Sequence, residues 1–155
     1  MKAPILSALF VALAALSGCA RPFTPATPNN FVELDDQKAY DYRATSPEGV
    51  VMGVRAIDND AEGGLGFWTQ SVELTMQGKP GYALLEKKDV ACLGGLKGVE
   101  MKYAHDDGGD PHLYDVTVFV TKKRIYVLEA GGAKVDMERY GESVDWSIRN
   151  FRPKT

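Results

Sequence analysis

Residues 112–129 decide the fold and read His-Leu-Tyr-Asp-Val-Thr-Val-Phe-Val-Thr-Lys-Lys-Arg-Ile-Tyr-Val-Leu-Glu. The first part, His112 to Thr121, places Leu, Val and Phe at spacings that suit a strand in a half-buried sheet. Lys122-Lys123 predicts a tight turn, and Arg124 to Glu129 predicts the returning strand. Because only an antiparallel pair can be joined by so short a connection, the stretch predicts an antiparallel hairpin.

Toward the amino terminus, several further stretches have the pattern of strands, and one has apolar residues at the spacing of a helix. Further strands are predicted over residues 39–45, 50–57, 82–90 and 99–105. Between the second and third of them, apolar residues recur at three- and four-residue steps, a spacing that keeps them on one helix face. These residues are Leu65, Trp68, Val72 and Met76. The sequence therefore predicts one helix between two groups of strands.

Toward the carboxyl terminus, Gly131-Gly132 is expected to break the last strand, and a second helix is expected to follow. Its buried face would be formed by Tyr140, Val144, Ile148 and Phe151. The predicted order is two strands, a helix, about four strands and a helix. This order predicts an α+β domain with an antiparallel sheet of about six strands and two helices.

The amino-terminal leader differs in composition from the rest of the chain. The 155 residues carry a net charge of −3 and are 45 % apolar, but the first eighteen contain one charge, Lys2. The apolar run from Ile5 to Leu16 is about twelve residues long, whereas a membrane-spanning helix needs about twenty. A positive start and a short apolar centre followed by small residues are typical of a cleaved signal peptide.

The four residues Leu16-Ser17-Gly18-Cys19 resemble the lipobox of bacterial lipoproteins. In that family the cysteine thiol receives a diacylglycerol, the leader is cut before it, and the new amino terminus is acylated, as with palmitate. The resemblance implies that Leu16, Ser17 and Gly18 are read by the signal peptidase and that Cys19 is lipidated. Two or three acyl chains would hold the protein on the membrane, since each buried CH₂ adds about 0.8 kcal/mol.

The residues after the cysteine bear on the location and organisation of the protein. Ala20 stands where Gram-negative lipoproteins of the inner membrane often have Asp, so the outer membrane, facing the periplasm, is expected. The stretch Arg21 to Asn30 holds three prolines and is expected to be an extended spacer, with Phe23 a bystander near the lipid. The expected divisions are residues 1–18 (signal peptide), 19–30 (lipidated cysteine and tether) and 31–155 (one domain).

Cys92 would be alone in the mature chain if Cys19 is lipidated. It lies among Val90, Ala91 and Leu93, where a free cysteine behaves as a small buried hydrophobe.

Several local strings resemble the PsbP-like superfamily, which includes PsbP and the bacterial lipoproteins DcrB and LpqN. They are the opening hairpin Tyr40–Ile57 with its turn Ser46-Pro47-Glu48-Gly49, the helix with Phe67-Trp68, the turn Gly94–Gly98, the hairpin Tyr114–Glu129 and the closing helix. The resemblance covers most of residues 31–151. It implies that fold and, because most members of the family bind partners without catalysing a reaction, a non-enzymatic accessory role.

Two acidic loops contain residue types that bind metal ions, although we do not expect a metal site. The first runs from His105 to His112 and contains His105, Asp106, Asp107, Asp110 and His112. In a regular hairpin His105 and His112 would face each other, but Asp, Gly and Pro are also ordinary turn formers. The second contains Asp58, Asp60 and Glu62, and it mimics the first half of a calcium loop. It lacks the final bidentate glutamate, and its acids also suit a helix amino terminus.

Most enzyme and nucleic-acid classes find no support in the sequence. The acidic balance disfavours nucleic-acid binding, and neither a nucleophile elbow nor a phosphate-binding glycine loop is present. We expect a lipid-anchored envelope module that needs no cofactor beyond its acyl chains, is not an enzyme and binds an envelope protein. A small-ligand carrier and a divalent-metal enzyme at the His105–His112 loop remain alternatives. The sequence does not indicate an oligomeric state.

Overall fold

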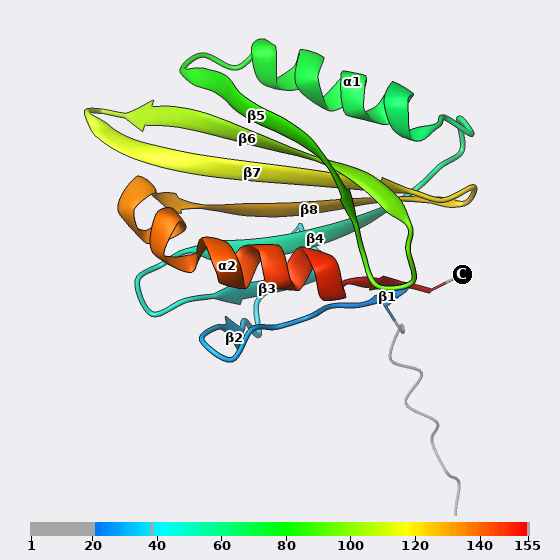
Figure 1. Cartoon of the computed structure of the whole chain (residues 1–155), viewed down its shortest axis with the longest axis horizontal. Helices are drawn as coiled ribbons and strands as arrows, with labels where there is room; N and C mark the ends of the chain where they lie inside the picture. Colours follow the sequence, from blue (N-terminus) through cyan, green and yellow to red (C-terminus); the bar gives the residue numbers. More distant parts are fainter. Residues whose placement is uncertain (1–20, 38, 155) are drawn as a thin grey trace, which may run out of the picture.

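The β7–β8 hairpin lies at the centre of the structure, a computed structural model that describes residues 21–37 and 39–154 (Figure 1). Strand β7 (Asp110–Val120) pairs antiparallel with β8 (Arg124–Ala133), with Val118 opposite Val127. This confirms the hairpin predicted from the sequence. The predicted signal peptide and Cys19 lie outside the described residues.

The hairpin is extended on both sides into one antiparallel sheet. Its order, within the described part of the chain, is β2-β3-β4-β8-β7-β6-β5. The other strands are β2 (Val32–Glu33), β3 (Tyr42–Thr45), β4 (Val51–Asp58), β5 (Tyr82–Ala91) and β6 (Lys97–Asp107). The predicted α+β class is confirmed, and the sheet has seven strands instead of about six because the two-residue β2 is added at one edge.

The two helices, α1 (Leu65–Gln77) and α2 (Lys134–Asn150), cover opposite faces of the sheet (Figure 1). Alternate residues of β7 supply both cores. Val116 packs in the cluster that contains residues of α1, and Phe119 in the cluster that contains residues of α2. The expectation that this strand is half-buried is therefore wrong, since both of its faces are covered.

Both helices lie where their apolar spacing predicted them. In α2 the predicted face is buried at Tyr140, Val144 and Ile148. The charges also suit the helix dipole, with Asp136 in the first turn and Arg149 in the last. No helix in residues 21–37 or 39–154 has the length and apolar content needed to cross a membrane.

Gly131-Gly132 does not break β8, which continues to Ala133. The glycines are needed because other parts of the sheet approach them closely. A Cβ on Gly131 would lie 3.2 Å from the Tyr114 ring, and one on Gly132 would lie 3.3 Å from the Cα of Val50. These residues thus mark close packing inside the strand.

The stretch Arg21–Asn30, predicted to be a spacer, is part of the folded domain. Strand β1 (Phe23–Thr24) pairs antiparallel with β9 (Arg152–Pro153). The Phe23 side chain is 1 % exposed and packs against Phe151, with ring centroids 5.3 Å apart. The prediction that Phe23 is a bystander is therefore wrong.

Hydrogen bonds hold the rest of this stretch against the domain. The hydroxyl groups of Thr27 and Tyr42 lie 2.6 Å apart, and the Ser147 hydroxyl donates to the carbonyl of Ala26 at 2.7 Å. An extended, proline-rich backbone can lie along a folded surface as readily as it spans solvent. Composition therefore did not indicate that this stretch packs against the domain.

The substitution Phe23→Ala is expected to lower the free energy of unfolding by about 3–5 kcal/mol, because it empties a buried aromatic site. Val32→Ala, at a position that is 70 % exposed, is the control and should change it by less than about 0.5 kcal/mol. Denaturant unfolding of the purified variants measures both. Equal, small effects would mean that this segment is not part of the fold.

Candidate functional site

Helix α1 covers only part of its face of the sheet. It contacts β5, β6 and β7, and a groove remains between the helix and the neighbouring strands β7, β8 and β4. This α1 groove has a volume of about 390 Å³. It is lined by Arg55, Ile57, Trp68, Ser71, Val72, Thr75, Met76, Lys79, Tyr114, Val116, Val118, Ile125, Val127 and Glu129.

The floor of the α1 groove follows from the two-residue period of the strands. Val116 and Val118 point to this face from β7, and Ile125 and Val127 do so from β8. Ile57 of β4 is 47 % exposed at its open side. Val116, Val118 and Ile125 are buried, at 3 %, 0 % and 3 % exposure. Ile57 and the partly buried Val127 therefore supply the apolar surface that the groove presents to solvent.

One end of the α1 groove is charged. The carboxylate of Glu129 is bound by the Arg55 guanidinium at 2.6 Å and also accepts a hydrogen bond from the Tyr114 hydroxyl. The side chain of Glu129 is 7 % exposed, whereas that of Arg55 is 41 % exposed. A buried carboxylate needs such partners, and here they fix its position.

Two tyrosines complete this charged end. Burial raises the pKa of Tyr114, and the charge of Glu129 raises it further, so the hydroxyl stays protonated and donates. The Tyr40 ring lies 5.1 Å from the Arg55 guanidinium and 5.8 Å from that of Arg43. The arginines at this end are thus supported by an aromatic face.

The opposite end of the α1 groove is positioned by Asn59, which is 4 % exposed. Its side-chain oxygen accepts the indole N–H of Trp68 at 3.0 Å. Its amide donates to the carbonyls of Gly63 and Thr121 at 3.0 and 3.1 Å. The amide therefore fastens the loop before α1 to the β7–β8 turn and fixes the Trp68 ring against the groove.

Asn59 belongs to the loop whose acids resembled half of a calcium site. Asp58 of that loop pairs with Arg124 at 3.0 Å; Asp60 and Glu62 are exposed. Sequence reasoning considered the acids and missed the buried amide between them, because Asn in a polar loop is also an ordinary turn residue.

His105 and His112 face each other across β6 and β7, as a regular hairpin predicts. The His105 ring stacks on Tyr82 with centroids 4.3 Å apart, and Nδ1 of His112 lies 2.9 Å from the carbonyl oxygen of Asp110. Asp106 accepts the N–H of Gly109 at 2.7 Å and so caps the turn. The side chain of Asp107 lies outside the description.

Within the described residues, no group of three or more His, Cys, Asp or Glu side chains is arranged to hold a metal ion.

Cys92 is 5 % exposed and lies in the core beneath α2, as expected of a small buried hydrophobe. Burial raises the pKa of its thiol.

A second cluster of charges, which sequence reasoning missed, is buried on the α2 side of the sheet. Asp115 of β7 is 5 % exposed and Glu100 of β6 is 2 % exposed. Lys102 lies 3.7 Å from Asp115, and Lys88 lies 3.1 Å from Glu100. The position of Asp115 between the inward-facing Leu113 and Thr117 was the available signal, but it becomes visible only if both faces of β7 are known to be covered.

Burial raises the pKa of Asp115 to about 6 and outweighs the lowering effect of Lys102. One carboxylate oxygen, Oδ1, has no hydrogen-bond partner among the described residues. Asp115 also lines a small cavity of about 20 Å³ between the sheet and α2. The charged form is thus poorly satisfied in the folded state.

The pKa of Asp115 predicts how stability depends on pH. Since the folded-state pKa, about 6, exceeds the ordinary 3.8, protonated Asp115 favours folding at low pH. That contribution is lost as the pH rises from about 4 through about 6. Asn at this position stays neutral at every pH. The free energy of unfolding of Asp115→Asn, relative to that of the wild type, is therefore expected to rise by up to about 3 kcal/mol between pH 4 and pH 8.

Unfolding measured at several pH values tests this expectation. Asp89→Asn on the exposed part of β5 is the control, and its difference from the wild type should not change with pH. If the free energies of unfolding of Asp115→Asn and the wild type change with pH in the same way, the raised pKa of Asp115 is contradicted.

The comparisons with known proteins concern the fold. No family model and no curated protein matches the sequence. The solved structure of LpqN, involved in cell envelope biogenesis of Mycobacterium tuberculosis, superposes with a TM-score of 0.68 at 11 % identity, over 84 % of this chain and 83 % of that one. At this identity the likeness establishes the fold alone.

Two further solved structures have a similar fold. Cyanobacterial PsbP (CyanoP) from Synechocystis sp. PCC 6803 gives a TM-score of 0.56 at 12 % identity, over 91 % of this chain and 98 % of that one. A Pseudomonas aeruginosa protein of unknown function, PA94, a putative regulator in its description, gives 0.55 at 13 % identity, over 81 % and 83 % of the chains. The predicted PsbP-like fold is confirmed.

Proposed function

We propose that this chain is a lipid-anchored protein of the bacterial cell envelope whose domain binds a partner protein without catalysing a reaction. The observation that carries the proposal is the α1 groove, an apolar trough with a charged end that the fold leaves open beside α1. We assign it as the binding site for an extended segment of the partner.

The anchor in this proposal is Cys19, and it rests on the sequence. Leu16-Ser17-Gly18-Cys19 follows a short apolar run in the arrangement of a lipobox, and Ala20 favours the outer membrane with the domain facing the periplasm. A diacylglycerol and an amide-linked acyl chain such as palmitate on Cys19 would keep the groove at that membrane. The shared fold with LpqN, an envelope-biogenesis protein, is compatible with that location.

The shape of the α1 groove favours a segment of a protein as its occupant. Carriers of small molecules bury most of the ligand surface, whereas Ile57, nearly half exposed, lines the open side of this groove. An extended segment would cover that side with its own backbone and place apolar side chains on Ile57 and Val127.

The charges of the α1 groove indicate one feature of that segment. Glu129 is already neutralised by Arg55, and Lys79 has no ion-pair partner among the described residues. The exposed charge at the groove is therefore positive. A carboxylate on the partner, next to its apolar residues, would complement Lys79.

The same groove also favours a second candidate, a carrier of a small apolar molecule. Its volume of about 390 Å³ and apolar floor lie in the range of small-molecule sites. A divalent-metal enzyme at the His105–His112 loop is not proposed, since His105 is stacked on Tyr82 and Asp106 caps the turn.

The anchor is tested by mass spectrometry of the protein purified from membranes. The wild type is expected to begin at Cys19 and to carry the added mass of a diacylglycerol and an acyl chain, because the lipobox directs both modifications. Cys19→Ala should lack that mass. A wild-type protein with an unmodified amino terminus would refute the anchor.

The groove is tested with Ile57→Asp, which places an unpaired carboxylate on its apolar floor. Desolvating that charge on binding costs several kcal/mol, so recovery of a stoichiometric partner from solubilised membranes should fall about tenfold or more. Val135→Asp, at a 63 % exposed position on α2, is the matched control and should leave recovery unchanged.

Thermal unfolding verifies that both variants are folded. Equal recovery with Ile57→Asp and the wild type would overturn the assignment of the groove. A small molecule detected by native mass spectrometry in the wild type, and lost from Ile57→Asp, would favour the carrier.

A further inference from the structure

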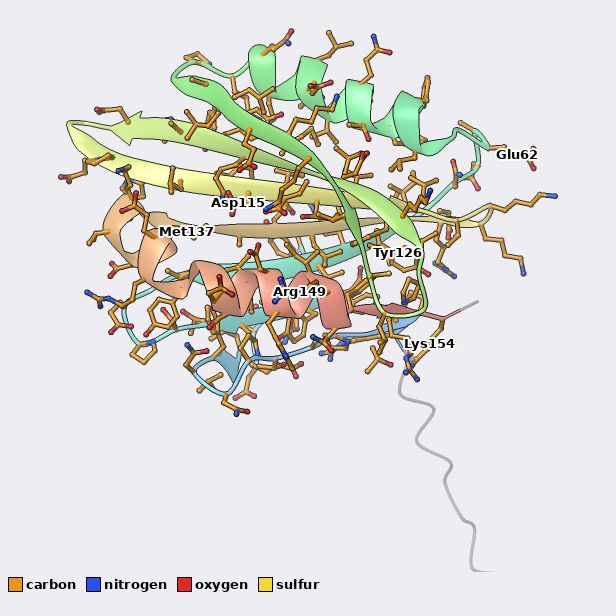
Figure 2. The ribbon with its side chains drawn as sticks, viewed as in Figure 1. Glu62, Asp115, Tyr126, Met137, Arg149 and Lys154 are labelled. Carbon is orange, nitrogen blue, oxygen red and sulfur yellow. The ribbon has the colours of Figure 1, made fainter. Side chains whose placement is uncertain are left out.

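The two ends of the described chain are fastened together at one place. The Lys154 N–H donates to the carbonyl of Pro22 at 2.9 Å, which extends the β1–β9 pair. Beneath them, the buried Tyr126 hydroxyl lies 3.2 Å from the same carbonyl and 3.3 Å from that of Lys154. Figure 2 shows Tyr126 and Lys154 at this end of the molecule. The position of Pro22 relative to the sheet is therefore fixed.

This attachment leaves little chain between the domain and the proposed lipid. Only Ala20 separates Cys19 from Arg21, the first described residue. Two residues span at most about 7 Å. The inference below rests on the proposed lipidation of Cys19, because that modification would bring the end of the domain that holds Pro22 to the headgroups.

Basic side chains gather at the same end. We define the terminal basic surface as Arg21, Lys122, Lys123, Arg124, Arg152 and Lys154. A hollow of about 470 Å³ lies there between the β7–β8 turn and the two ends of the described chain, and no carboxylate among the described residues lines it. Its lining includes Pro22, so the hollow adjoins the point where the chain continues toward Cys19.

Part of this positive charge is compensated and part is not. Arg124 pairs with Asp58 at 3.0 Å, and Arg21 pairs with Glu33 at 2.5 Å. Lys122 and Lys123 have no ion-pair partner among the described residues, and neither does Lys154, whose ammonium donates to a backbone carbonyl. These three exposed lysines are available to an external anion.

An exposed apolar residue lies near the same end. The N–H of Leu93, in the turn between β5 and β6, donates to the carbonyl of Phe151 at 3.0 Å, which brings that turn beside β9. The Leu93 side chain is 42 % exposed. An apolar side chain next to lysines suits the interface of a bilayer, where it can enter the acyl region beneath the headgroups.

We infer that the terminal basic surface rests on anionic phospholipid headgroups of the membrane that carries the anchor. Lysines near such a surface are attracted to its negative charge. The basic surface therefore orients the domain that the acyl chains retain. Because it lies at the β7–β8 turn, this end of the two strands faces the membrane.

The test uses the native acylated protein in vesicles and measures lysine reactivity. The protein is placed in phosphatidylcholine vesicles with or without phosphatidylglycerol, labelled with an amine-acetylating reagent and analysed by peptide mass spectrometry. Lys122, Lys123 and Lys154 are expected to react several-fold more slowly when phosphatidylglycerol is present. Lys79 and Lys134, exposed on the two helical sides, are internal controls and should not change.

A pair of variants separates contact with lipid from a general effect of the vesicle. Lys122→Gln with Lys123→Gln weakens the surface, so Lys154 should regain much of its reactivity. Lys87→Gln with Lys134→Gln, at exposed positions outside this surface and the α1 groove, should leave Lys154 protected. Inorganic phosphate added to the protein in detergent should not protect the lysines. Equal protection by phosphate would contradict a membrane surface and indicate a free-anion site.

Different results would refute the lipid anchor and the contact of the basic surface with the membrane. A chain that carries no acyl mass and stays in solution refutes the anchor and, with it, this inference. An acylated, vesicle-bound protein whose three lysines react as fast with phosphatidylglycerol as without it overturns the inference alone.

Discussion

The structure depends on the burial of β7 and β8 on both faces of one sheet. Val118 and Phe119 point in opposite directions and are both fully buried, so each face of the sheet needs its own cover. Helix α2 and the terminal segments provide it on one side. Helix α1 provides it on the other but lies over β5, β6 and β7, so the apolar face is left partly open toward β4. The candidate binding groove is thus a consequence of incomplete coverage.

A cluster of aromatic rings holds the two ends of the described chain together. Phe23 comes from the beginning of the described chain, Tyr126 from β8 and Phe151 from the end, and their ring centroids lie 5.3 to 6.2 Å apart. Such contacts add to the burial of the rings themselves. The cluster fixes Phe23, two residues after Arg21, the first described residue. The proposed anchor at Cys19 would therefore hold the domain against the bilayer. A rigid placement of this kind would direct the groove, whereas a flexible tether would allow every orientation.

Local periodicity was enough to predict much of the fold. The apolar spacing of Tyr140, Val144 and Ile148 identified α2, and Lys122-Lys123 marked the central turn. Phe23 could not be placed, since β1 has two residues and its partner strand lies at the other end of the chain. For the site, apolar positions such as Val116 and Val127 were predictable as strand residues. The pairing of Arg55 with Glu129 was not, because β4 and β8 are brought together only by the complete sheet. The lipidation of Cys19 stays a prediction.

The central claim is that the side of the sheet partly covered by α1 is the working surface of the domain. Photo-crosslinking in living cells tests it most directly, with a photoreactive residue placed in turn at four exposed positions. Ile57 and Thr75, which line the groove, are expected to capture the same protein. Leu74 and Val135, which are 60 % and 63 % exposed outside it, should capture none. Capture of that protein from Leu74 or Val135 but not from the groove positions would contradict the claim.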